Sequence, residues 1–291
     1  AHVDNYLIRL SPHMPSGHGS DMLNYYIQCF GEFERIGDHA VNLTENAQEF
    51  LDRSASLSPT AHQELMVLRE VLGEILDYTY KAFAATDYEA ARHIEPVEEV
   101  VDDLVATLRA NHIRRVRDGQ CTVYAGLTFL DILVNVERIA DQCSNVGVFT
   151  LSMFDEHIMN NHHDYIQALH QGKDPVFNRA YQEAHDKYFG ELKRIEIATM
   201  LARGTKMSIF DEPEAGIDLW SFQNLISVFE KMHETIHGSI LIISHQERIL
   251  ETADKIVVLV DGEVRTIGTK DEIMPVLMEA SRVCSRLADK V

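Results

Sequence analysis

The chain has 291 residues, enough for two domains that each bury a core of their own. Apolar residues make up 45% and charged residues 25%, which is typical of folded globular proteins and excludes a disordered chain. Acidic residues number 46 against 26 basic ones, and the formal net charge of −20 argues against binding nucleic acid or an anionic membrane through overall charge.

The four cysteines are scattered and form no C-x-x-C pair. The opening stretch AHVDNYLIRL lacks the pattern of a secretion signal, and no apolar run approaches the roughly 18 residues that a membrane-spanning helix needs. We therefore expect free thiols in a reducing compartment. The expected location is the cytoplasm, and any position peripheral to the inner membrane would be reached indirectly, through a transporter.

Up to about residue 188 the sequence has helical periodicity, with apolar residues recurring at spacings of three and four. Thr60 is expected to cap the second of the long helices. Short breaks such as RDGQ favour antiparallel neighbours in a bundle. The four predicted helices are residues 22–51, 61–85, 86–116 and 124–153.

After residue 189 the pattern changes to short apolar runs of strand length, MSIF, SILIIS and KIVVLV, separated by segments long enough for helices. Such alternation predicts a mainly parallel sheet covered by helices. Asp261-Gly262 indicates a hairpin turn. The predicted fold is an all-α bundle over residues 1–188 followed by an incomplete α/β unit over residues 189–291.

Two stretches of the helical part match each other: FERIGDHAVN at 33–42 and VERIADQCSN at 136–145. Their offset is the size of a three-helix unit and implies an internal duplication. In each copy a Glu, an Asp and an Asn fall at i, i+4 and i+8, so they form one ridge along the helix.

The acidic pairs of this ridge are Glu34/Asp38 and Glu137/Asp141. Carboxylates at i and i+4 repel each other by about 0.2–0.5 kcal/mol on an exposed helix, whereas a bound cation would turn them into ligands. A solvated acidic face is the simpler interpretation of one copy, but two copies in register favour a site for hard or borderline metal ions. Weaker candidates, in a dense acidic run on the third predicted helix, are Glu99, Asp102 and Asp103.

In its ERIGD-A-N context the repeated Glu-x-x-x-Asp motif resembles the phosphate-uptake regulator family, PhoU, over roughly residues 1–188. The resemblance implies divalent or trivalent metal ions bound by the two acidic pairs, and regulation of phosphate transport through contact with a transporter or its ATPase. The tail HHDYIQALHQGKDPVFNRAYQEAHDKY is similar to the version attached to bacterial sodium/phosphate cotransporters. Because only AHVDNYLIRL precedes the first motif helix, we expect the first repeat to be truncated at its N-terminus.

The stretch FGELKRIEIATMLARGTKMSIFDEPEAGIDLWSF, with LIISHQERIL and KIVVLVDGEVRTIGTKDEI after it, resembles the second half of an ATP-binding-cassette (ABC) ATPase, most closely the SufC type of iron–sulfur cluster assembly. The resemblance implies that Asp211 holds magnesium through water, that Glu212 is the catalytic base and that His245 contacts the γ-phosphate. Asp218 would lie on the D-loop. The remainder of the family's signature motif is Gly190 and Glu191.

A phosphate cradle is missing from this sequence. The P-loop pattern G-x-x-x-x-G-K-[ST] does not occur, and the Gly172-Lys173 pair is followed by Asp174 and lacks a glycine five positions earlier. We therefore expect ATP and magnesium to bind only if another chain supplies a P-loop, and the chain alone to be inactive as an ATPase. A sheet without its early strands should also expose strand edges or apolar faces and favour self-association.

Three hypotheses follow from these resemblances. The first is a PhoU-like metal-binding regulator joined to an ABC fragment, with phosphate-transporter or ABC ATPase components as partners and no nucleic acid. The second is an ATP-hydrolysing subunit of SufC type that acts with a P-loop supplied in trans. The third is a non-functional fusion of gene fragments.

Overall fold

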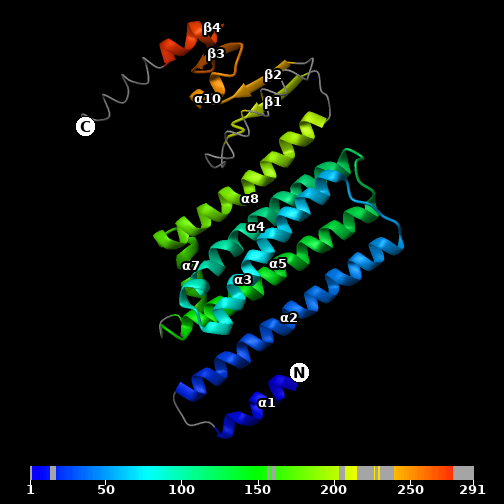
Figure 1. Ribbon diagram of the computed structural model, residues 1–291, viewed down its shortest axis with the longest axis vertical. Coiled ribbons are helices and arrows are strands. Elements are labelled where there is room, and N and C mark those ends of the chain that lie inside the picture. The colour runs from blue at the N-terminus through cyan, green and yellow to red at the C-terminus, as the bar shows by residue number, and fades with distance from the viewer. Residues whose placement is uncertain are drawn as a thin grey trace, which may run out of the picture. The chain divides into compact units, whose positions relative to one another are not determined.

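The computed structural model describes residues 2–13, 18–155, 158, 161–202, 207–214, 226, 229 and 239–277 (Figure 1). Contacts divide the chain into two compact units, Ala1–Ile195 and Glu196–Val291. The division falls within the helix α8, as does the boundary at 188/189 expected from the sequence. In the part of the chain that the structure describes, no helix has the length and apolar character needed to cross a membrane.

The first unit is helical, as predicted. Its elements are α1 (His2–Leu10), η1 (Ser11–His13), α2 (His18–Asp52), α3 (Pro59–Ala85), α4 (Tyr88–Arg117), α5 (Val123–Ser152), α7 (His162–His170) and α8 (Pro175–Ala202). The four long helices predicted from periodicity correspond to α2, α3, α4 and α5, with ends that agree within four residues.

Side-chain caps explain where three of these helices begin. Ser58 accepts a hydrogen bond from the Ala61 N–H at 3.2 Å at the start of α3, with Pro59 as the first helical residue. The expectation that Thr60 caps this helix was wrong, because Thr60 already lies in its first turn. Asp87 and Thr122 cap α4 and α5 in the same way.

The core of this unit lies between α3, α4 and α5, which pack against one another, while α2 packs chiefly against α5. α4 and α5 contribute the largest buried stretches, including Ile94, Leu104 and Leu108 from α4 and Phe129 and Leu133 from α5. α8 adds Tyr188 and Leu192 to the same cluster. Because α4 is packed on several sides, two of its acidic residues, Glu95 and Glu98, are buried.

The second unit contains two pairs of strands among its described residues. β1 (Met207–Asp211) and β2 (Ser239–Ile243) are parallel, with Met207 opposite Ser239 and Asp211 opposite Ile243. After the short helix α10 (Glu247–Leu250), β3 (Lys255–Val260) and β4 (Glu263–Thr269) form an antiparallel hairpin.

The hairpin turn is the one predicted, since Asp261 and Gly262 both have positive φ, 51° and 79°. The mainly parallel sheet was predicted only in part: in the described residues β3 pairs with β4 and not with the parallel pair. One face of the parallel pair is apolar and exposed, formed by Met207, Ile209, Leu241 and Ile243. Parallel strands are normally covered on both faces, so the expected exposure of an apolar face is confirmed here.

Candidate functional site

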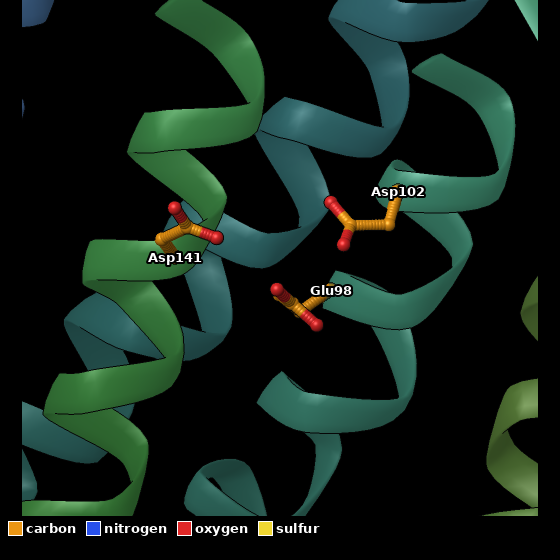
Figure 2. A group of neighbouring side chains, drawn as sticks. All are labelled: Glu98, Asp102 and Asp141. Atoms are coloured by element: carbon orange, nitrogen blue, oxygen red, sulfur yellow. The ribbon is translucent and has the colours of Figure 1, made fainter. Parts of the chain in front are cut away.

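Three carboxylates converge in the helical unit: Glu98 and Asp102 on α4, and Asp141 on α5 (Figure 2). One oxygen of each lies within 4.8 Å of the others. Glu98 and Asp102 are four residues apart, so the same side of α4 presents both, and Figure 2 shows all three side chains directed into the space between the two helices. We call Glu98, Asp102 and Asp141 the acidic trio. The spacing of their oxygens suits a single cation with oxygen ligands.

The trio is electrostatically strained at neutral pH. Burial, together with the nearby charges of Glu95, Asp102 and Asp141, raises the pKa of Glu98 to about 9. Burial and the neighbouring Glu137 raise the pKa of Asp102 to about 6. The pKa of Asp141 is also raised by burial, although Arg138 opposes that shift. The three carboxyl groups therefore cannot all be ionised near pH 7 unless a positive charge joins them.

Glu98 carries the strongest indication of a ligand. Its side chain is only 8% exposed, it points into the trio, and within the described ranges no hydrogen bond or ion pair holds it. A buried carboxyl group without a partner costs free energy that a packed apolar residue would not. A cation held by the trio would supply the missing partner.

The two acids of the second motif copy have different surroundings. Asp141 is a member of the trio and also accepts a hydrogen bond from Arg138 at 3.0 Å. Glu137 lies one turn earlier on α5 and pairs with Arg109 of α4, with 3.1 Å between Oε2 and Nη2. The structure thus places Glu137 beside the trio without making it a member.

The first motif copy lies on α2, where Glu34 and Asp38 are both exposed and outside the trio. Its neighbours on the same helix contact α5. His39 Nδ1 is 2.9 Å from the Asn135 side-chain oxygen, and Asn42 donates to the same oxygen at 3.2 Å. The role of Glu34 and Asp38 as metal ligands stays a prediction.

Two hydrogen bonds between α2 and α5 join equivalent positions of the two sequence repeats, with the partners exchanged. Asn42 donates to Asn135, and Asn145 donates to Glu32 at 3.3 Å. The repeat offset makes Asn42 equivalent to Asn145 and Glu32 equivalent to Asn135. Such an exchange of equivalent partners is the property of a two-fold interface, so the two motif helices pack across an internal two-fold axis. The acidic helix α4 precedes α5, the helix of the second motif copy, and packs against it.

The sequence prediction missed Glu98 and included two acids that the structure assigns elsewhere. Glu99 lies 3.2 Å from His170 of α7, and Asp103 accepts a hydrogen bond from Tyr181 of α8 at 2.6 Å. Asp102, the third weaker candidate, belongs to the trio. The missed signal was the four-residue spacing of Glu98 and Asp102, which repeats the spacing of the motif pairs.

In the second unit, Asp211 and Glu212 lie where β1 ends, at the carboxyl edge of the parallel pair. The Glu212 N–H donates to the Ile243 carbonyl at 2.8 Å, and His245 Nδ1 lies 3.5 Å from Glu212 Oε1. Glu212 has φ of 41°, a left-handed conformation that a glutamate rarely adopts outside constrained sites. The structure thus brings together three of the residues predicted for ATP hydrolysis, with Glu212 and His245 both largely exposed.

Among the remaining residues predicted to contact a nucleotide, the structure describes two. Gly190 and Glu191 lie in the interior of α8, where backbone N–H groups serve the helix's own hydrogen bonds and not a phosphate. Asp218 lies outside the described residues. Their part in binding a nucleotide stays a prediction.

Comparison with known proteins gives two separate likenesses. The PhoU domain family model matches residues 65–149, a segment that contains α4, most of α3 and α5, and all of the acidic trio. The chain is also 37% identical over 83 residues to a putative ABC transporter ATP-binding protein of Pyrococcus abyssi, covering 28% of this chain and 32% of that protein. It is 34% identical over 93 residues to the energy-coupling factor transporter ATP-binding protein EcfA2 of Latilactobacillus sakei, covering 32% of each.

The chain therefore spans about a third of the length of these ABC relatives. The predicted PhoU and ABC likenesses are both confirmed at this level. The finer resemblance to the SufC type remains a prediction.

Proposed function

We propose that the helical unit is a metal-binding regulator of phosphate transport that holds a divalent or trivalent cation at the acidic trio. One observation carries this proposal: three carboxylates converge within the segment that matches the PhoU domain, and one of them, Glu98, is buried without a partner in the described structure. Its partners would be a phosphate transporter or the ATPase of one.

The chemistry of the trio favours hard or borderline cations such as Mg²⁺, Mn²⁺ or Fe³⁺, because every ligand atom is a carboxylate oxygen. Ionising all three acids would place three negative charges between α4 and α5, and Arg138 offsets only part of that charge. A cation relieves this repulsion directly. By the internal two-fold relation, we also propose Glu34 and Asp38 as ligands of a second, more exposed site on α2.

Removing one member of the trio should weaken metal binding strongly. We expect Asp102→Asn or Asp141→Asn to raise the dissociation constant for Mn²⁺ at least about tenfold, since even the loss of an outer-sphere partner costs that much at many metal sites. The measurement is titration of Mn²⁺ followed by the electron paramagnetic resonance signal of the free ion. Asp131→Asn is the matched control, because Asp131 is exposed on α5 away from the trio. Wild-type binding in both trio variants would refute the proposed site.

A second candidate function is ATP hydrolysis with a P-loop supplied by another chain, as in an ABC subunit of SufC type. The observation that favours it is the meeting of Asp211, Glu212 and His245 at one edge of the parallel strands. Phosphoryl transfer depends mainly on positioning and charge neutralisation, and a carboxylate next to a histidine at strand ends can take part in both.

This second candidate makes a separate prediction. The chain alone should show no ATP turnover, whereas turnover should appear when it is mixed with a subunit that carries an intact P-loop. Glu212→Gln should then lower that turnover by about 10²–10⁴-fold, the usual contribution of a general base. Glu263→Gln on β4 is the control for loss of one exposed charge in the same unit. Turnover by the isolated chain, or no response to Glu212→Gln, would contradict the candidate; a chain with neither metal binding nor turnover supports a non-functional fusion.

A further inference from the structure

The ion pair between Arg109 and Glu137 lies directly beside the acidic trio. Arg109 is seven residues after Asp102, two turns further along the same side of α4, and Glu137 is one turn before Asp141 on α5. Their side chains are 43% and 32% exposed. The pair therefore continues the line of charged groups between the two helices without being part of the trio.

Glu137 already acts on the trio electrostatically. Its charge is the strongest of the neighbouring charges that raise the pKa of Asp102, and it also raises that of Asp141. A carboxylate that close could approach a cation in the trio by a change of side-chain conformation, since residues one turn apart on a helix have Cβ atoms about 5–6 Å apart. Arg109 is the group that holds it in its present place.

We propose that a bound cation displaces Arg109 as the partner of Glu137, so that Glu137 becomes its fourth carboxylate ligand and Arg109 sets the affinity of the site. The proposal rests on the proposed metal-binding function and describes its regulation. Two observations carry it: Glu137, the acid of the second motif copy that stays outside the trio, is held by Arg109 from the facing helix, whereas Asp141 pairs with Arg138 of its own helix, and the buried Glu98 already points to a cation beside it. A partly exposed ion pair is weak enough to exchange, because its two ions are solvated when separated.

Arg109 and Glu137 should consequently show coupled effects on metal binding. Without Arg109, Glu137 is available to the cation from the start, so Arg109→Gln should tighten Mn²⁺ binding by about two- to fivefold, the range expected for releasing a partly exposed ion pair. Arg109→Lys keeps a competing charge and should leave the affinity near wild type. Glu137→Gln should weaken binding because it removes a ligand.

The test is a double-mutant cycle with Mn²⁺ titrations of the wild type, Arg109→Gln, Glu137→Gln and the double variant. The gain from Arg109→Gln should disappear when Glu137 is already glutamine. Arg114→Gln is the control for loss of an exposed positive charge on the same helix. Thermal unfolding of each metal-free variant verifies that it is folded before the titrations are compared.

The possible results have distinct meanings. A gain from Arg109→Gln that persists in the Glu137→Gln background would show an effect of overall charge and overturn the exchange. Unchanged affinity in Glu137→Gln would also overturn it. If Asp102→Asn binds Mn²⁺ like the wild type, the metal site itself fails; if Asp102→Asn loses binding while the cycle is additive, only the exchange fails.

Discussion

Replacing Glu98 with glutamine is expected to stabilise the metal-free protein by roughly 3 kcal/mol at pH 7. In the folded protein the pKa of Glu98 is raised to about 9, against an ordinary value of 4.5. Between these two pKa values the folded state keeps a proton that the unfolded state loses. The contribution of protonated Glu98 to the free energy of unfolding is therefore fully present below pH 4.5 and declines as the pH rises towards 9. Because glutamine does not ionise, the stability of the variant should decline much less over this pH range.

The measurement is the free energy of unfolding by denaturant at pH 5, 7 and 9 in the presence of a chelator. The advantage of Glu98→Gln over the wild type should be small at pH 5 and grow towards pH 9. Glu70→Gln on the exposed side of α3 is the control and should follow the wild type. A variant that loses stability at every pH, or gains equally at all three, would show that Glu98 is not held protonated by its surroundings.

Metal affinity should rise steeply with pH, whereas the stability of the metal-free protein should fall. A cation needs ionised carboxylates, and near neutral pH Glu98 holds a proton that must leave when the metal enters. We expect the Mn²⁺ dissociation constant to fall by about tenfold per pH unit between pH 7 and pH 8. Below pH 6 the dependence should steepen, because the pKa of Asp102 is raised to about 6 and a second proton then competes.

Titrations at pH 6, 7 and 8 test this dependence. In Glu98→Gln the affinity should be weaker at high pH and should change less between pH 7 and pH 8, since the competing proton is gone. An affinity that is constant across this range in the wild type would contradict the account.

The long helices of the first unit were predictable because each is marked by local signals. Apolar spacing gave their extents, and the repeat placed the Glu-x-x-x-Asp ridges on α2 and α5. The trio could not be predicted in the same way. Its members come from two consecutive helices, with Asp141 43 residues after Glu98 and 39 after Asp102. Which side of α4 faces Asp141 depends on packing that spacing alone does not determine.

In the second unit, local and non-local pairings were predicted with different success. The Asp261-Gly262 turn determines its hairpin locally, and the hairpin was predicted correctly. The expected joining of the KIVVLV strand to the parallel pair is not seen in the described residues. A parallel neighbour depends on a crossover connection, while a hairpin partner lies next to it in sequence. The expected signature residues Gly190 and Glu191 lie within a helix because the run from 175 to 202 contains no residue that ends it.

The most direct test of the account is the number of protons released when Mn²⁺ binds at pH 7. Calorimetric titrations in two buffers of different ionisation enthalpy give this number without any assumption about affinity. The account predicts about one proton released per Mn²⁺ by the wild type and close to none by Glu98→Gln. Binding by the wild type without proton release, or equal release by both proteins, would show that the cation does not bind at the buried carboxyl group.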